Sequence, residues 1–237
     1  KRQDINTLVK ELTLEEKISL LTGFNSWYSN KIPRLKIPSM KMSDGPNGVR
    51  GDSTSGKSSA CFPCPISMGS TWNKKLIKKI GTALGEEALD KDVDVLLGPT
   101  INLHRHPLGG RHFENFSEDP FLTAEIAVAY VKGVQSKKVS ACLKHFVAND
   151  TEFERHTVSS NLDERTLREV YLLPFEMGIK KAKAKSVMSA YNKLNNIYCS
   201  SNEDLLVKVL KKEWGFDGYV VSCLLYTSDA ADDVVRV

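Results

Sequence analysis

Four polar segments hold the residue types that could do chemistry: SDGPNGVRG (43–51), NLHRHPLGGRHFENFSEDP (102–120), KHFVANDTEFER (144–155) and SAYNKLNN (189–196). Carboxylates accept hydrogen bonds from hydroxyl groups, whereas Arg and Lys donate to hydroxyl oxygens. A concave surface that carries both kinds of group suits a polyhydroxylated sugar, and a phosphate site would be more uniformly basic. A metal site would need more His, Cys or carboxylate ligands. The segments therefore predict a site for a sugar-like small molecule, with no metal or other cofactor.

The candidate binding residues of these segments are charged or aromatic: Asp44, Arg50, Arg105, Arg111, Lys144, His145 and Tyr191. Two of them have a structural alternative. Asp44 lies in an Asp-Gly-Pro turn that it would help to shape, and Arg111 would form an ion pair with Glu114 inside a long loop. A lysine and a histidine directly after an apolar strand are harder to explain by structure alone, so Lys144 and His145 are the strongest candidates.

Short apolar runs that predict strands begin near residues 41, 93, 139, 186 and 218, and a polar segment follows each of the first four. Long helices are predicted between them, each starting at a capping residue: Asn73, Asp119, Asp163 and Ser201. Pro174 lies inside the third of these helices and should kink it. Strands that alternate with long helices are typical of parallel βαβ units.

Two α/β folds place functional residues at the carboxyl ends of parallel strands. A doubly wound sheet usually carries a glycine-rich phosphate loop after its first strand, and no such motif occurs in the sequence. The sequence therefore predicts an α/β fold of the (β/α)8 TIM-barrel-like type. Since a closed barrel of this type has eight strands and five are convincing here, we expect the barrel to be incomplete at its C-terminal end.

Composition argues against several other classes of protein. The net charge of the 237 residues is +4, and the lysine clusters at 73–80 and 180–185 lie on the polar faces of two predicted helices. We therefore expect no nucleic-acid partner. No apolar run approaches the ~20 residues of a membrane span, so we expect no membrane partner, and the first residues show no secretion signal. Five cysteines give no disulfide framework, and Cys61 and Cys64 lack the second pair of a zinc site.

Five motifs together resemble a known family: SDGPNGVRG, GRHFENFSEDP, KHFVANDTEFER, DERTLREVYLLPFE and MSAYNKLN, in this order. Over about residues 13–222 the sequence resembles the N-terminal barrel of glycoside hydrolase family 3, and most of all its β-glucosidases. The resemblance implies a retaining enzyme that hydrolyses terminal non-reducing β-D-glucosyl residues of O-glycosides through a double displacement. β-Xylosidases and arabinosidases of the same family are the near alternatives. The N-acetylglucosaminidase branch fits less well, because Val147-Ala148-Asn149-Asp150 stands in place of its Pro-Gly-His-Gly turn.

The resemblance also implies roles for individual residues. Asp44 would bind hydroxyls at the far edge of the glucosyl ring, and Arg50 would support its loop. The remaining ring hydroxyls would be held by Arg111, Lys144 and His145. The wall of the pocket beside the nucleophile would be formed by two further residues, Met188 and Tyr191.

The nucleophile position is occupied by Cys223. In the family, the motif that corresponds to GFDGYVVS (215–222) is followed by a catalytic Asp, and here Cys223 follows it. We interpret residues 1–222 as a partial family domain and residues 223–237 as a tail foreign to the family, which resembles a translated sequencing adapter. The chain as written is then expected to be inactive, because no residue matches the family's general acid/base either. A different class of function is the alternative: a non-catalytic carbohydrate-binding protein with a genuine Cys223.

Overall fold

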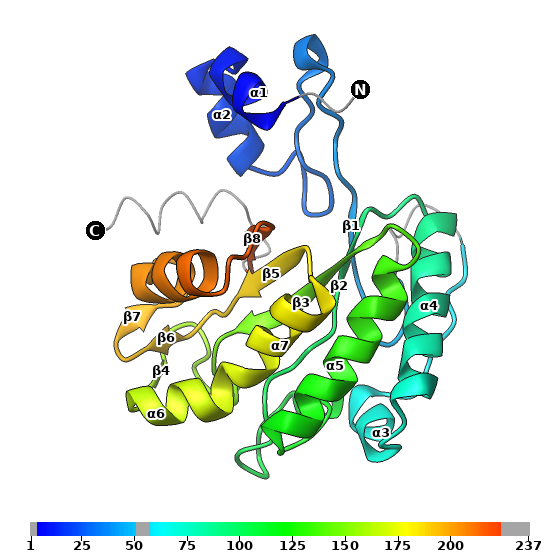
Figure 1. Ribbon diagram of the computed structural model, residues 1–237, viewed down its shortest axis with the longest axis vertical. Coiled ribbons are helices and arrows are strands. Elements are labelled where there is room, and N and C mark those ends of the chain that lie inside the picture. Colours follow the sequence, from blue (N-terminus) through cyan, green and yellow to red (C-terminus); the bar gives the residue numbers. More distant parts are fainter. Residues whose placement is uncertain (1–3, 51–56, 224–237) are drawn as a thin grey trace.

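Five parallel strands form the main sheet of the structure, a computed structural model that describes residues 4–50 and 57–223 (Figure 1). They are β1 (Met42–Asp44), β2 (Val95–Leu97), β3 (Ser140–Phe146), β5 (Ser186–Ser189) and β8 (Tyr219–Ser222). Their order in the sheet, β1-β2-β3-β5-β8, follows their order in the sequence. Every neighbouring pair is parallel. The predicted α/β class and the five predicted strands are confirmed.

Helices α4 (Lys74–Asp90), α5 (Pro120–Gln135) and α7 (Leu173–Ala182) lie in a row along one face of this sheet (Figure 1). Two glycines allow α4 and α5 to approach closely. A Cβ added to Gly81 would lie 2.5 Å from the carbonyl oxygen of Tyr130, and one added to Gly133 would lie 2.4 Å from that of Lys78. The largest side chains between these helices and the sheet are fully buried: Ile77, Leu84, Leu96, Ile126, Tyr130, Leu143, Phe146 and Phe175.

The predicted helix starts are confirmed in three of the four cases. Asn73, Asp119 and Asp163 each accept a hydrogen bond from a backbone N–H of the first turn, which satisfies a donor that the helix cannot pair internally. The fourth prediction, Ser201, is wrong. The side chain of Asn202 accepts from the N–H of Leu205 instead, and the element that follows is a π-helix, η4 (Asp204–Glu213).

The helix that was predicted to kink at Pro174 is interrupted before that residue. The helix expected from Asp163 onward is divided into α6 (Glu164–Thr166), the π-helix η3 (Leu167–Tyr171) and α7. Pro174 lies in the first turn of α7. A proline there costs no backbone hydrogen bond, because the first N–H groups of a helix have no partner inside it.

The remaining elements are short. They are α1 (Ile5–Glu11), α2 (Leu14–Leu21), η1 (Pro33–Leu35), α3 (Pro65–Ser70), η2 (His112–Glu114), β4 (Ser159–Ser160), β6 (Lys193–Leu194) and β7 (Ile197–Tyr198). Helix α2 begins with a capping box, in which Thr13 and Glu16 each accept from the other's backbone N–H. Helices α1 and α2 lie apart from the α4–α5–α7 row (Figure 1). Among the residues described, no helix is both long and apolar enough to cross a membrane.

The predicted boundary between a family domain (1–222) and a foreign tail (223–237) falls at the end of the last strand. β8 ends at Ser222, and Cys223 is the next residue. Residues 224–237 lie outside the described part of the chain.

Candidate sugar-binding site

The carboxyl ends of β1 and β3 bring Asp44 and Lys144 together, although they are 100 residues apart in the sequence. Lys144 Nζ donates to Asp44 Oδ1 at 2.9 Å, and the lysine side chain is only 4% exposed. Arg50, which is largely exposed, lies 3.9 Å from the other oxygen of Asp44. Burial raises the pKa of Asp44, but the charges of Lys144 and Arg50 and hydrogen bonds from Lys144 and Gly45 outweigh it, so the pKa is lowered. Asp44 is therefore an ionised acceptor at neutral pH.

Arg111 stands at the start of η2, in the long loop after β2, and forms ion pairs with two glutamates. Its Nε bonds the carboxylate of Glu114, and its Nη1 lies 4.0 Å from Glu152 Oε1. Glu114 is buried and also accepts from the hydroxyl of Thr100 at 3.1 Å. The ion pair that was the structural alternative for Arg111 is thus present. It fixes the guanidinium in place but uses few of its five N–H donors.

His145 is held by the side chain of Asn102. The chain after β2 runs alongside Lys144, since the N–H of Ile101 bonds the carbonyl of Lys144 at 2.8 Å. This pairing places Asn102 beside His145, with three contacts of 2.9–3.2 Å between the two residues. Burial lowers the pKa of His145 well below its usual range, and the charges of Lys144, Arg111 and Arg155 lower it further. The imidazole is therefore neutral at physiological pH.

Tyr191 lies against two residues of the loop after β3. The guanidinium of Arg155 is 5.0 Å from the centre of its ring, and the ring of His156 packs edge-on at 4.5 Å. Arg155 Nη1 in turn donates to Glu152 Oε2 at 2.8 Å. Burial, together with the neighbouring Cys223, raises the pKa of Tyr191 to about 12. Glu152 thus forms ion pairs with both Arg111 and Arg155, and Arg155 also contacts the ring of Tyr191.

Met188 and Cys223 belong to an apolar cluster, and Cys223 contacts Tyr191. Met188 pairs with Val221 across β5 and β8 and lies in an apolar cluster with Val95, Cys142 and Cys223. Burial raises the pKa of the Cys223 thiol. A hydrogen bond with Tyr191 and the charges of Lys144, Arg111 and Arg155 act in the opposite direction but do not cancel the effect of burial. The thiol is therefore neutral, although three cations lie close enough to act on it.

One predicted residue, Arg105, contacts a different element, and three residues of the arrangement were not predicted. Arg105 Nε donates to the hydroxyl of Tyr171 in η3 at 3.1 Å, and its guanidinium lies 5.8 Å from the centre of the Tyr171 ring. The missed residues are Asn102, Glu152 and Arg155. All three belong to the polar segments picked out in the sequence, but nothing in their spacing shows that they contact His145, Arg111 and Tyr191. Within residues 4–50 and 57–223, no group of three or more His, Cys, Asp or Glu could hold a metal ion.

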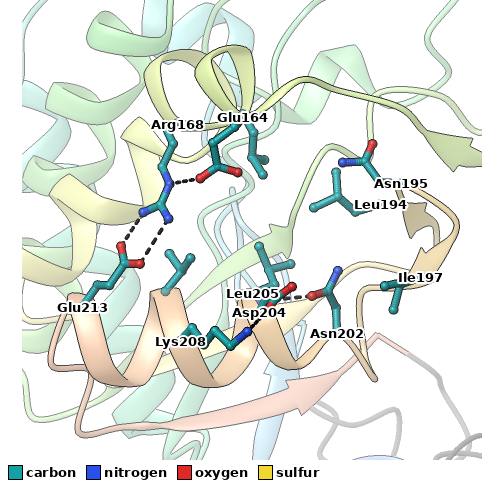
Figure 2. Close-up of a pocket in the computed structure, with 12 residues that line it drawn as sticks. Glu164, Arg168, Leu194, Asn195, Ile197, Asn202, Asp204, Leu205, Lys208 and Glu213 are labelled. Atoms are coloured by element: carbon teal, nitrogen blue, oxygen red, sulfur yellow. Dashed lines mark hydrogen bonds and ion pairs between the residues drawn. The ribbon is translucent and has the colours of Figure 1, made fainter.

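A separate pocket of ≈ 290 Å³ lies on the outside of the fold, between η3, the β6–β7 hairpin and η4 (Figure 2). Its charged residues are paired with one another. Arg168 bonds both Glu164 and Glu213, and Lys208 bonds Asp204 (Figure 2). None of the predicted binding residues lines this pocket.

Comparison with known proteins gives consistent matches along the chain. The profile of the "Glycosyl hydrolase family 3 N terminal domain" matches residues 10–234. A "Beta-glucosidase" of Rhizobium radiobacter is 56% identical over 220 residues, which are 92% of this chain and 27% of that protein. The "Thermostable beta-glucosidase B" of Acetivibrio thermocellus is 48% identical, over 92% of this chain and 30% of its own length. The chain thus spans between a quarter and a third of the length of these relatives.

Solved structures match equally well. Beta-glucosidase 3B from Thermotoga neapolitana, in complex with alpha-D-glucose, superimposes with a TM-score of 0.89 at 45% identity, covering 93% of this chain and 34% of that one. The beta-glucosidase from Kluyveromyces marxianus in complex with glucose gives a TM-score of 0.91 at 44% identity, covering 93% and 27% of the two chains.

Proposed function

Because the chain belongs to glycoside hydrolase family 3, we propose that it carries the glucosyl-binding site of a retaining β-glucosidase acting on terminal non-reducing β-D-glucosyl residues of O-glycosides. One observation carries the proposal. Asp44, Lys144, His145 and Arg111 come from three separate segments and meet at the carboxyl ends of parallel strands. Relatives named as β-glucosidases and structural neighbours with bound glucose support the same substrate.

We infer further that the five strands are part of a (β/α)8 barrel. Two features support this. The strands follow one another in the sheet in sequence order, and helices α4, α5 and α7 cover one face (Figure 1). In barrels of this type the functional residues lie at the carboxyl ends of the strands, which is where Asp44 and His145 lie.

The proposed site combines hydrogen-bond acceptors and donors in a way that suits sugar hydroxyls. The ionised Asp44 would accept from two hydroxyl groups, and Lys144 and Arg111 would donate to hydroxyl oxygens. Charged partners make these hydrogen bonds stronger than neutral ones. Met188 and Tyr191 would line the side of the ring nearest position 223, and Arg50 would support the Asp44 loop.

Position 223 is the proposed location of the nucleophile. In a retaining glycosidase a carboxylate attacks the anomeric carbon, and water later hydrolyses the glycosyl-enzyme. A carboxylate here would experience the charges of Lys144, Arg111 and Arg155, which act on the Cys223 thiol in this chain. Nearby cations keep a carboxylate ionised. The neutral Cys223 thiol is a poor substitute, since only the thiolate is an effective nucleophile.

Cys223 also favours a second candidate, a carbohydrate-binding protein without hydrolytic activity. The two candidates make the same use of Asp44, Lys144 and His145 and differ only at position 223. Re-sequencing the gene across codon 223 separates them. An Asp codon followed by a Trp codon would support the β-glucosidase, and a genomic Cys codon would support the binding protein.

Calorimetric titration of this chain with methyl β-D-glucoside tests the proposed site. We expect saturable binding that Asp44→Asn weakens about 10- to 100-fold, the usual effect of losing a hydrogen bond to a charged group. Asp204→Asn is the matched control, because Asp204 also pairs with a lysine but lies at the outer pocket. Absence of binding by the folded chain, or equal loss in both variants, would contradict the proposal.

The stereochemistry of a gene product with Asp at position 223 tests the proposed mechanism. Double displacement predicts that the β-anomer of glucose is released first. Proton NMR of the earliest hydrolysis products distinguishes the two anomers, and α-glucose as the first product would rule out retention.

A further inference from the structure

The contacts between Asn102 and His145 determine which ring nitrogen of the histidine carries a proton. Asn102 Nδ2 donates to the backbone carbonyl of His145 at 2.9 Å, and the backbone N–H of His145 donates to Asn102 Oδ1 at 2.9 Å. The polarity of the backbone is fixed, so these two bonds also fix which end of the amide is oxygen. A flipped amide would place two donors together and two acceptors together.

The same amide oxygen lies 3.2 Å from Nδ1 of the His145 ring. An amide oxygen can only accept a hydrogen bond, so Nδ1 must be the donor and must carry a proton. A neutral imidazole has one N–H only, and burial and the charges of Lys144, Arg111 and Arg155 lower the pKa of His145. Nε2 is therefore a bare acceptor, and it has no hydrogen-bond partner among residues 4–50 and 57–223.

We propose that Asn102 is a positioning residue that fixes His145 as the Nδ1–H tautomer, so that Nε2 offers the substrate a hydrogen-bond acceptor. This inference rests on the proposed function of the site. The cations that surround His145 can only donate: Lys144, Arg111 and Arg155. Nε2 of His145 is thus a hydrogen-bond acceptor, whereas the neighbouring cations are donors. A sugar hydroxyl that bonds Nε2 must therefore act as the hydrogen-bond donor.

This polarity predicts a specificity that size alone would not give. A hydroxyl can donate to Nε2 and accept from a neighbouring cation at the same time. A fluorine, an ether oxygen or an anionic oxygen has no proton for Nε2 and would present a second lone pair to it. The site should therefore discriminate between a hydroxyl group and an acceptor of similar size at one position of the sugar ring.

The tautomer can be measured directly in this chain, independently of any sugar. Nitrogen-15 NMR of histidine-labelled protein distinguishes protonated from bare ring nitrogens, and the spectrum of His145→Phe identifies the signals of His145 among those of five histidines. We expect a protonated Nδ1 and a bare Nε2 that do not change from about pH 8 to about pH 6, where an ordinary histidine titrates. A proton on Nε2, or an imidazolium in this range, would overturn the proposal.

Two substitutions test the role of Asn102. Asn102→Ala removes the acceptor and should give a mixture of tautomers. Asn102→Asp keeps an acceptor beside Nδ1 and should retain the Nδ1–H tautomer while raising the pKa of His145 through its negative charge. Asn202→Ala is the control, since Asn202 is also buried and also bonds a backbone N–H, but at the start of η4. An unchanged His145 spectrum in folded Asn102→Ala would show that Asn102 does not set the tautomer.

Titration with deoxy- and deoxyfluoro-glucosides tests the consequence for substrates. Where a hydroxyl meets a cation, fluorine should bind better than hydrogen, because fluorine still accepts. Where it meets Nε2, fluorine should bind no better than hydrogen, and both should bind about threefold to tenfold more weakly than the hydroxyl, the usual effect of one lost neutral hydrogen bond. If fluorine exceeds hydrogen at every position, the acceptor role of Nε2 is wrong. If no glucoside binds although the tautomer is as expected, the proposed function fails and the tautomer assignment stands.

Discussion

Two regions of this molecule combine apolar surface with pairs of opposite charge, and they differ in how those pairs are built. At the outer pocket, Arg168–Glu164 and Lys208–Asp204 join residues four apart in the sequence, Arg168–Glu213 joins residues 45 apart, and all of these side chains are 36–73% exposed. At the strand ends, Lys144–Asp44 joins residues 100 apart, and the lysine is 4% exposed. The strand-end pair joins the more distant positions and buries one of its two charges.

The difference in burial shows why the outer pocket is not the better candidate site. Exposed pairs between neighbours on a helix contribute little, because water screens them. A buried lysine pays a large desolvation cost unless it is paired. Packing alone would therefore not favour a lysine at position 144, whereas the charged residues around the outer pocket stay exposed to water.

The largest expected effect is on catalysis at position 223. The unmodified chain should hydrolyse neither an aryl β-glucoside nor cellobiose, and Cys223→Asp should not restore cellobiose hydrolysis. The resemblance assigns no general acid to residues 13–222, and general acid catalysis is worth about 10²–10⁴-fold. An aryl glucoside needs less protonation of its leaving group, so both substrates should be assayed. Cellobiose turnover by Cys223→Asp at an ordinary enzymatic rate would mean that an acid is present here, and activity of the unmodified chain would reject the assignment of position 223.

The next effect is on stability. Lys144→Met removes the partner of Asp44 from a largely buried site and should lower the free energy of unfolding by about 3 kcal/mol, the lower end for breaking a buried pair, because Asp44 retains some exposure. Lys208→Met should change it by about 0.5 kcal/mol or less. Urea denaturation of the two variants measures both. Equal values would remove the distinction between the two regions.

The strands and most of the helix starts that position Lys144 and Asp44 could be predicted from the sequence. Capping residues such as Asn73 and Asp119 mark helix starts through bonds to the next few residues, and apolar runs mark the strands. These are local signals. Because parallel strands bring their carboxyl ends to one edge of a sheet, the order of elements also predicted that Asp44, Lys144 and His145 would be neighbours.

The contacts that the sequence did not predict are those between separate loops. Asn102 bonds His145 because the chain after β2 runs beside Lys144, and no local pattern encodes that register. Arg105 and Arg111 were both predicted as binding residues because of their type and their place in the same loop. In the structure, Arg105 bonds Tyr171. Residue type identified both candidates, and only the path of the loop separates them.

A smaller effect concerns pH and compares two aspartates. Burial raises the pKa of Asp150 to about 6, against 3.8 for an ordinary aspartate. A raised pKa means that the stability contribution is fully present below about pH 4 and is lost as pH rises to about 6, because the ionised form is disfavoured in the folded state. Asp150→Asn should remove this loss and raise the free energy of unfolding at pH 7 by about 3 kcal/mol, because the pKa lies about two units above its ordinary value. Denaturation at a series of pH values measures it, with Asp204→Asn as the exposed control. A parallel pH profile for Asp150→Asn and the unmodified chain would show that Asp150 titrates normally.

The smallest expected effect is at the outer pocket, and salt makes it diagnostic. Arg168 pairs with Glu164 and Glu213, all at least 36% exposed. Arg168→Gln should therefore lower the free energy of unfolding by only about 0.5–1 kcal/mol at low salt. In about 1 M NaCl the screening length falls to about 3 Å, so most of this difference should disappear.

The loss caused by Lys144→Met should persist in the same salt, because buried charges are poorly screened. Glucoside binding should be unchanged in Arg168→Gln, since Arg168 lies outside the proposed site. A salt-independent loss in Arg168→Gln, or weaker sugar binding, would mean that the outer pocket is coupled to the strand ends after all.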